Sequence, residues 1–284
     1  MSTAWLESNL HSPTLRIIDV RGQVLPPGNA VRYLAKRADY DASHIPGARF
    51  LDWTTDIVDA EDPVPLQVAS THAFAETMQR LGVGDDTLVV AYDDYNHIFA
   101  GRLAWALRYY GHDAAVVLDG GWSRWKAEER PTSSDAPDTF SATFTARAQP
   151  HLRRTADEVS RALGRPGVLV VDARAPDQYA GRTSVARRGG HIPGARNVHY
   201  SQLIDARSGR FCSEEELGRV FADAGVDVSH LPPEIIVYCN SGVSCTAVLN
   251  AFRLFGRSDA AVYDGSWNEW GNDEARPVTG GGDP

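Results

Sequence analysis

The chain has 284 residues, enough for two domains of ordinary size that each bury a core. Its composition, 43% hydrophobic and 23% charged, is typical of a soluble globular protein, and a formal net charge of -9 argues against nonspecific binding to nucleic acid. No apolar run approaches the roughly 20 residues of a membrane span, and the first residues lack the pattern of a signal peptide. We therefore predict a cytoplasmic protein with no nucleic-acid partner and no membrane partner.

Taken in chain order, the two halves repeat the same short sequences. The matched segments are 15–21 with 168–174, 44–49 with 191–196, 81–83 with 224–226, 89–92 with 235–238, and 119–122 with 264–267. The match of 44–49 with 191–196, HIPGAR in both, is complete. Ordered matches of this kind indicate an internal duplication.

Each half alternates short β-branched runs with helical patterns, which predicts an α/β fold with two similar domains. Apolar runs such as 15–20, 168–173 and 235–238 read as buried strands. Ser/Thr-x-x-Glu capping boxes predict helix starts at 155–158 and 213–216. We expect a mainly parallel sheet in each domain, with helices on both faces.

The polar, proline-bearing stretch 130–138 predicts the boundary between the domains. We place an N-terminal domain at 1–135, a linker at 136–150 and a C-terminal catalytic domain at 151–284.

The segment 238–246, YCNSGVSCT, carries the predicted chemistry. Cys239 follows a strand and precedes a helix, so the free amides of the helix N-terminus favour its thiolate and lower its pKa. Gly242 lets the backbone curl, and the small residues leave room for inward-pointing amides. We predict a nucleophilic cysteine in an anion-binding loop, for which a buried structural cysteine is the alternative. The loop residues that would bind the anion are Asn240, Ser241, Gly242, Val243 and Ser244.

The repeat shows that this cysteine occurs in one half alone. Aligning Tyr92 with Tyr238 places Asp93 opposite Cys239. Since a carboxylate does not attack sulfur as a thiolate does, the first half is predicted to be non-catalytic and to support a site in the second.

Three cysteines are too few and too oddly numbered for a disulfide framework. Cys245 lies six residues after Cys239, where a cysteine-based phosphatase has an arginine, so phosphate chemistry is disfavoured. Cys245 either packs as a small buried side chain or resolves an oxidised Cys239 as a disulfide. Cys212 receives no role.

The duplicated residues favour structural roles. His191, in the repeated HIPGA sequence, is predicted to be structural, whereas His44 either does the same or faces the thiol across the domain interface. The duplicated Asp-x-Arg pairs at 19–21 and 172–174 are predicted to be structural ion pairs. Three arginines precede His191 in the sequence: Arg182, Arg187 and Arg188. They would either bind an anionic substrate or lie solvated on the surface.

Together, the HIPGA, DGGW/DGSW and cysteine-loop sequences resemble the tandem-domain rhodanese sulfurtransferases over nearly the whole chain. The resemblance implies two rhodanese-like domains and a ping-pong sulfurtransferase that needs no cofactor. Cys239 would take a sulfane sulfur from a small anionic sulfur donor as a persulfide. It would then pass the sulfur to cyanide, a thiol or a reduced thioredoxin-like acceptor.

The subtype within that family depends on the loop. The loop 239–244 is uncharged, like that of 3-mercaptopyruvate sulfurtransferases, and this favours mercaptopyruvate as sulfur donor. In that subfamily the loop serine and a first-domain histidine assist proton transfer, which implies catalytic roles for Ser241 and His44. Gln178 stands where those enzymes have an arginine, so thiosulfate remains the alternative and a carboxylate clamp would come from Arg182 or Arg187.

Other functions remain open at this point. A non-enzymatic persulfide carrier would take sulfur without turnover, and a rhodanese-fold interaction module would not take it at all. A thiol–disulfide redox protein would use Cys239 and Cys245.

Overall fold

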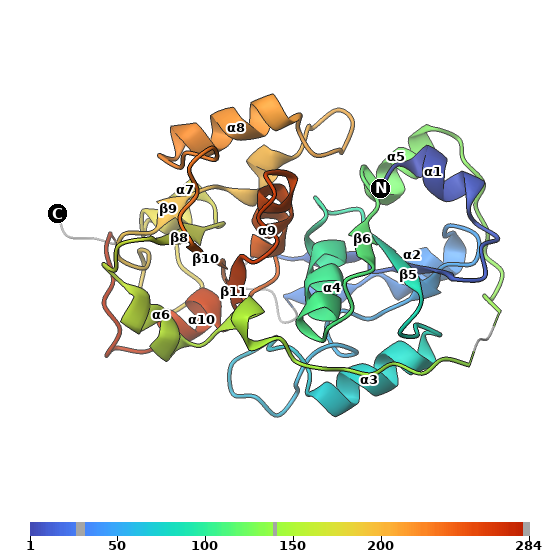
Figure 1. The fold of residues 1–284 in the computed structure, drawn as a ribbon, viewed down its shortest axis with the longest axis horizontal. Helices are drawn as coiled ribbons and strands as arrows, with labels where there is room; N and C mark the ends of the chain where they lie inside the picture. Colours follow the sequence, from blue (N-terminus) through green and yellow to red (C-terminus); the bar gives the residue numbers. More distant parts are fainter. Residues whose placement is uncertain (27–31, 139–140, 281–284) are drawn as a thin grey trace. The chain divides into compact units, whose positions relative to one another are not determined.

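The computed structural model describes residues 1–26, 32–138 and 141–280, and it forms two compact units (Figure 1). Unit 1 comprises Met1–Ala60, Val68–Gln149 and Ala206–Arg210, and unit 2 comprises Glu61–Gln67, Pro150–Asp205 and Phe211–Pro284. A short segment of each half therefore belongs to the unit built mostly from the other half. The proposed domain limits 1–135 and 151–284 remain a prediction, and residues 139 and 140 of the predicted linker lie outside the described residues.

Unit 1 is built around a parallel sheet. Within the described ranges its strand order is β4-β1-β5-β6, and all three pairings are parallel. These strands are β1 (Leu15–Asp19), β4 (Arg49–Phe50), β5 (Leu88–Tyr92) and β6 (Ala115–Val117), with a separate antiparallel ribbon of β2 (Gly22–Val24) and β3 (Tyr33–Ala35). The helices are α1 (Thr3–Ser8), α2 (Arg37–Ala42), α3 (Thr71–Arg80), α4 (Ile98–Tyr109) and α5 (Gly121–Ala127).

Unit 2 repeats this topology and adds a strand at one edge. Its order is β7-β11-β10-β8-β9, so β9-β8-β10-β11 corresponds to β4-β1-β5-β6. The strands are β7 (Arg153–Arg154), β8 (Val168–Asp172), β9 (Arg196–Asn197), β10 (Glu234–Tyr238) and β11 (Ala261–Tyr263). The helices are α6 (Ala156–Ala162), α7 (Pro176–Tyr179), α8 (Glu214–Asp223), α9 (Cys245–Leu254) and α10 (Ser266–Trp270), with 3-10 turns η1 (Pro150–Leu152) and η2 (Tyr200–Leu203).

Helices cover both faces of each sheet, as predicted. In unit 1, α1 and α5 share a core with Ile17 and Val90, while α4 packs against β5 and β6. In unit 2, α6 and α10 share a core with Val170 and Ile236, while α9 packs against β10 and β11. Because adjacent strand residues point to opposite faces, burial of whole strands such as β1 requires this double cover. The predicted α/β fold is confirmed, and both predicted capping boxes are present at α6 and α8.

The repeated HIPGA sequences form the same turn in both units. The amide of Ala48 donates to the carbonyl of Ile45 at 2.9 Å, and the equivalent bond in unit 2 is 3.0 Å. Gly47 and Gly194 sit at φ 76° and 77°, the left-handed region that the third position of a type II turn requires. The predicted tight turn is confirmed, and it leads into β4 and β9.

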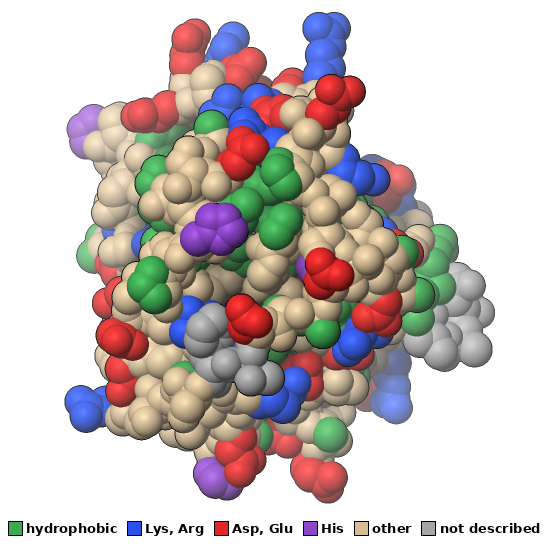
Figure 2. Space-filling view, turned by 90° about the vertical axis from the view of Figure 1, so that its right-hand side faces the viewer, with side chains coloured by type: hydrophobic (Ala, Val, Ile, Leu, Met, Phe, Trp, Pro, Cys, Tyr) green, Lys and Arg blue, Asp and Glu red, His purple; other side chains and the backbone are tan. Residues whose placement is uncertain are grey.

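No helix within the described residues is long and apolar enough to cross a membrane. On the face drawn in Figure 2, acidic and basic side chains are interspersed, and the described residues form no continuous basic surface there.

Candidate active site

The cysteine loop lies at the carboxyl end of a central strand of unit 2. β10 ends at Tyr238, the loop runs from Cys239 to Ser244, and α9 begins at Cys245. Gly242 adopts φ 72°, which turns the backbone back toward the thiol and confirms the role expected of this glycine. The carboxyl edge of a parallel sheet is where ligands usually bind in α/β folds.

The thiol of Cys239 is buried, and its pKa lies below the ordinary value of a cysteine. Burial raises its pKa, but hydrogen bonds to the sulfur outweigh burial and lower the pKa to about 5. The bonds come from the side chains of Cys245 and Ser244 and from the amides of Ser241 and Cys245. All four are neutral donors, so hydrogen bonding to the charged form stabilises the thiolate.

Ser266 holds the loop in place from the start of α10. Its Oγ accepts hydrogen bonds from the amides of Cys239 at 3.2 Å and Gly242 at 3.0 Å, and it donates to the carbonyl of Tyr263 at 2.8 Å. Ser266 adopts φ 53°, a left-handed conformation that costs free energy for a residue other than glycine. Its equivalent in unit 1 is Gly121 at φ 55°, so unit 2 carries backbone strain at the residue whose hydroxyl bonds to the two loop amides.

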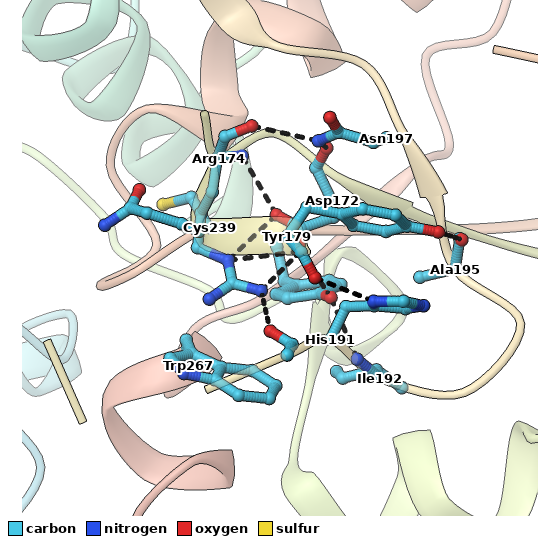
Figure 3. A network of polar contacts seen from close by, with 12 residues as sticks. Asp172, Arg174, Tyr179, His191, Ile192, Ala195, Asn197, Cys239 and Trp267 are labelled. Atoms are coloured by element: carbon cyan, nitrogen blue, oxygen red, sulfur yellow. Dashed lines mark hydrogen bonds and ion pairs between the residues drawn. The ribbon is translucent and has the colours of Figure 1, made fainter. Parts of the chain in front are cut away.

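A buried ion pair orients the strand end that carries Cys239 (Figure 3). Arg174 bonds to Asp172 through both Nε and Nη2, the latter at 2.6 Å, and the Tyr238 hydroxyl donates to the same carboxylate at 2.6 Å. Burial and that carboxylate raise the pKa of Tyr238 well above its usual range, so the hydroxyl keeps its proton. The guanidinium of Arg174 also lies 4.2 Å from the ring centroid of Trp267.

The same network recurs in unit 1, which confirms the predicted structural ion pairs. Arg21 pairs with Asp19 at 2.8 Å, and the Tyr92 hydroxyl donates to Asp19 at 2.5 Å. A buried bidentate pair of this kind holds its two side chains in one orientation. Removing either partner would leave a buried charge without compensation.

The loop of unit 1 encloses a carboxylate in place of the thiol. Asp93 Oδ1 accepts the amides of Tyr95 at 2.8 Å and His97 at 3.0 Å, and Oδ2 accepts those of Phe99 and Ala100, both at 2.9 Å. The residues of unit 2 that align with these four donors are Ser241, Val243, Cys245 and Thr246. Backbone amides of this loop therefore surround the Asp93 carboxyl group in unit 1.

The structure brings together several of the predicted loop residues. Ser241 and Ser244 reach the thiolate through an amide and a hydroxyl respectively, and Val243 is buried beside them. Asn240 points instead to Gln178, with its Nδ2 3.4 Å from Oε1, and its carbonyl accepts the amide of Asn268 at 2.9 Å.

His44 is enclosed by unit 1. Its Nδ1 lies 2.9 Å from the carbonyl of Tyr40 and its Nε2 lies 3.1 Å from that of Asp135, and the ring stacks on Tyr40. His191 makes the matching carbonyl contact and stacks on Tyr179 with ring centroids 3.7 Å apart. Both histidines tie the turn to a preceding helix, and the catalytic role of His44 remains a prediction.

The three arginines differ in their surroundings. Arg182 is exposed and paired with Asp177, and Arg187 is exposed with its amide bonded to Asn272. Arg188 donates to carbonyls of α10 and of the segment after it, so it anchors the loop before the second turn. Substrate binding by Arg182 or Arg187 also remains a prediction.

Two interactions at the site were not predicted from the sequence. Ser266 was visible as the one change between DGGW and DGSW, and that difference was the available signal. The donation of the Cys245 thiol to Cys239 could not be found from spacing, because it depends on how the loop curls. In the part of the chain that the structure describes, no group of three His, Cys, Asp or Glu side chains could hold a metal ion.

Comparison with known proteins agrees with the geometry of both units. The family described as Rhodanese-like domain matches residues 2–128 and 155–273. The chain therefore belongs to the rhodanese family, as a tandem of two such domains.

Relatives that align with this chain over nearly their whole length are named as sulfurtransferases. A putative thiosulfate sulfurtransferase 1 of Mycobacterium bovis is 33% identical over 98% of this chain and 96% of that protein. The thiosulfate sulfurtransferase of Rattus norvegicus is 33% identical over 95% of this chain and 91% of its own length. The crystal structure of SseA from Escherichia coli, presented as a 3-mercaptopyruvate sulfotransferase, aligns with a TM-score of 0.82 and 31% identity, covering 94% of this chain and 98% of that one. The chain is thus a member of the thiosulfate and 3-mercaptopyruvate sulfurtransferase family.

Proposed function

We propose that this protein is a sulfurtransferase that carries sulfur as a persulfide on Cys239, with 3-mercaptopyruvate as the preferred sulfur donor. The observation that carries the proposal is the position of Cys239, which is buried in the loop between β10 and α9, where hydrogen bonds from neutral donors lower its pKa to about 5. A thiolate is the nucleophilic form of cysteine, and it predominates here at neutral pH.

In the first half-reaction the thiolate attacks the sulfur of mercaptopyruvate. The Cys239 S–S bond forms, the C–S bond of the sulfur donor breaks, and its electron pair goes to carbon. The thiol proton of the sulfur donor ends on that carbon, so pyruvate leaves and a persulfide anion remains.

In the second half-reaction an acceptor attacks the outer sulfur and restores the thiolate. Cyanide leaves as thiocyanate, while a small thiol or a reduced thioredoxin-like protein leaves as its own persulfide. No cofactor takes part in either step, and the predicted compartment is the cytoplasm.

The first unit offers a guide to how the persulfide is held. An aspartate carboxylate and a cysteine persulfide both place two atoms in sequence beyond Cβ and carry one negative charge. The amides that bind Asp93 therefore indicate which amides of unit 2 meet the outer sulfur. By the alignment, the amide of Val243, which corresponds to that of His97, is one of them.

Electrostatics favours mercaptopyruvate over thiosulfate. Thiosulfate brings two negative charges to the reacting sulfur, whereas the charge of mercaptopyruvate sits on a distant carboxylate. The groups that bond to Cys239 are all neutral, so they give a dianion no compensating charge. In this proposal Arg182 or Arg187 binds the carboxylate, and Ser241 and His44 assist proton transfer.

Thiosulfate is the second candidate, favoured by a specific contact. Asn240 bonds to Gln178, which stands where the mercaptopyruvate enzymes have an arginine. The side chain beside the loop is therefore an amide and not a guanidinium. The names of the mycobacterial and rat relatives point the same way.

The test measures kcat/KM for both sulfur donors with cyanide as acceptor, in the wild type, in Cys239→Ser and in the control Cys212→Ser. We expect mercaptopyruvate to be better, Cys212→Ser to match the wild type, and Cys239→Ser to lose at least roughly a thousandfold. Full activity of Cys239→Ser with both sulfur donors would refute the mechanism, and a better kcat/KM for thiosulfate would overturn the donor preference. If mass spectrometry shows a sulfur on Cys239 but cyanide gives no turnover, the protein is a carrier.

A further inference from the structure

Helix α10 is joined to the cysteine loop by hydrogen bonds in both directions. The hydroxyl of Ser266 accepts two loop amides, as described above. In return, the amide of Trp267 donates to the carbonyl of Cys239 at 3.0 Å, and the amide of Asn268 donates to that of Asn240 at 2.9 Å. An isolated helix of five residues is not stable in water, so contacts with the rest of unit 2 must hold α10 in place.

Arg188 contacts α10 at both of its ends. Its carbonyl accepts the indole Nε1 of Trp267, near the start of the helix, at 3.1 Å. Its guanidinium donates to the carbonyl of Trp270, the last residue of the helix, at 2.7 Å. The same guanidinium donates to the carbonyls of Asp273 and Arg276, the latter at 2.7 Å. One residue therefore ties both ends of the short helix to the segment after it.

The aligned residue of unit 1 makes a different contact. When the repeated HIPGA sequences are superposed, Asp41 lies opposite Arg188. Asp41 is exposed and pairs with Arg37 of its own helix at 2.8 Å. An ionised carboxylate only accepts hydrogen bonds, so it cannot bind the carbonyls of a helix end. The contacts of Arg188 thus belong to the half that carries the nucleophile and are not a requirement of the repeated fold.

We propose that Arg188 is a positioning residue for sulfur transfer, which holds α10 so that the helix keeps the loop curled around Cys239. The inference rests on the proposed function, since it concerns the reactivity of that cysteine. Arg188 neither binds an anionic substrate nor lies solvated, because backbone carbonyls engage its guanidinium.

The effect passes from Arg188 to the thiol through the helix. Without the guanidinium the end of α10 loses its tie, and a displaced helix carries with it the groups of Ser266 and Trp267 that bond to the loop. The hydrogen bonds that lower the pKa of Cys239 come from this loop and the residue after it. A looser loop should therefore raise that pKa and slow the attack on the sulfur donor, while binding of the sulfur donor changes little.

The experiment compares Arg188→Ala and Arg188→Lys with the wild type and with Arg257→Ala. Arg257 is the matched control, because its guanidinium also donates to backbone carbonyls of unit 2. Those carbonyls belong to Pro232 and Pro233, which precede β10, at the end of the strand opposite the cysteine loop. Each full-length variant is measured for kcat and KM with 3-mercaptopyruvate and cyanide, for the pH midpoint of Cys239 alkylation, and for thermal unfolding.

We expect Arg188→Ala to lower kcat at least about tenfold while KM stays within about threefold. Its alkylation midpoint should rise from about 5 toward neutral pH by at least about one unit. Arg188→Lys, which keeps the charge but reaches fewer carbonyls, should lie between Arg188→Ala and the wild type. Arg257→Ala should lower thermal stability yet keep the kcat and the midpoint of the wild type.

The outcomes separate this inference from the proposed function. If Arg188→Ala keeps the kcat and midpoint of the wild type, if Arg257→Ala shifts them as far, or if KM alone rises, the positioning role is refuted while the persulfide mechanism stands. If the wild type gains no sulfur on Cys239 from mercaptopyruvate or thiosulfate, the proposed function itself fails. Should Arg188→Ala not fold, Arg188→Lys decides, because an unchanged kcat and midpoint in that variant would contradict the inference.

Discussion

The two loops of this protein surround different side chains, a carboxyl in unit 1 and a thiol in unit 2, and they differ both in backbone and in neighbouring side chains. His97 has a positive φ of 61°, whereas in unit 2 the left-handed residue of the loop is Gly242 at φ 72°. In unit 1, burial raises the pKa of the Asp93 carboxyl although backbone amides oppose the shift. In unit 2 the pKa of Cys239 falls to about 5 despite equal burial, because Ser244 and Cys245 add side-chain donors. The aligned residues in unit 1 are Ile98 and Phe99, which have no such donors. The second loop thus differs from the first by a thiol and by two neighbouring side chains that lower its pKa.

The test with the largest expected effect replaces Cys239 of unit 2 by aspartate, the residue that unit 1 has at the aligned position. Cys239→Asp should fold, because the aligned amides already surround a carboxylate in unit 1, and its sulfur transfer should fall at least roughly a thousandfold. Activity with mercaptopyruvate and thermal unfolding are the measurements. A large loss of thermal stability would show that the two loops are not interchangeable as anion sites.

The second test removes the anion of unit 1. Asp93→Ala should lower the free energy of unfolding by about 2 to 5 kcal/mol, since it leaves buried amides without their acceptor. Asp94→Ala, which breaks a partly exposed ion pair with Lys36, is the matched control and should cost no more than about 1 kcal/mol. Urea unfolding compares the two, and equal losses would contradict a special role for Asp93.

The third test concerns the change from DGGW to DGSW. Ser266→Gly removes the hydroxyl that holds two loop amides, and we expect kcat/KM to fall about tenfold, equivalent to about 1.4 kcal/mol. Glycine also relieves the left-handed strain, so thermal stability should change less than in Ser266→Ala. Unchanged activity in both variants would remove Ser266 from the site.

The smallest expected effect is on the pH dependence of the thiol. A pKa lowered to about 5 means that alkylation of Cys239 should be constant from neutral to alkaline pH and fall as pH drops through about 5. Ser244→Ala removes one donor to the thiolate, so the midpoint should move toward neutral pH while the rate at pH 8 changes by less than about threefold. Iodoacetamide labelling with peptide analysis measures both. A midpoint near the usual value for cysteine in the wild type would contradict the stabilised thiolate.

The sequence alone determined the duplication, the α/β class and the placement of Cys239 between a strand and a helix. These features are local: strand periodicity, capping boxes and a cysteine between strand and helix depend on neighbouring residues. It also identified Asp19 with Arg21 and Asp172 with Arg174 as structural pairs, because a network needed for folding appears in both copies.

The tertiary structure decided which side chains reach the sulfur. Cys245 and Ser244 donate to Cys239 because the loop turns at Gly242, and Ser266 supports the loop from a helix that follows another strand. It also placed the segments 61–67 and 206–210 with the opposite halves, an arrangement with no local signature. Contacts between residues distant in sequence depend on how strands and helices pack, and a linear pattern does not encode that packing.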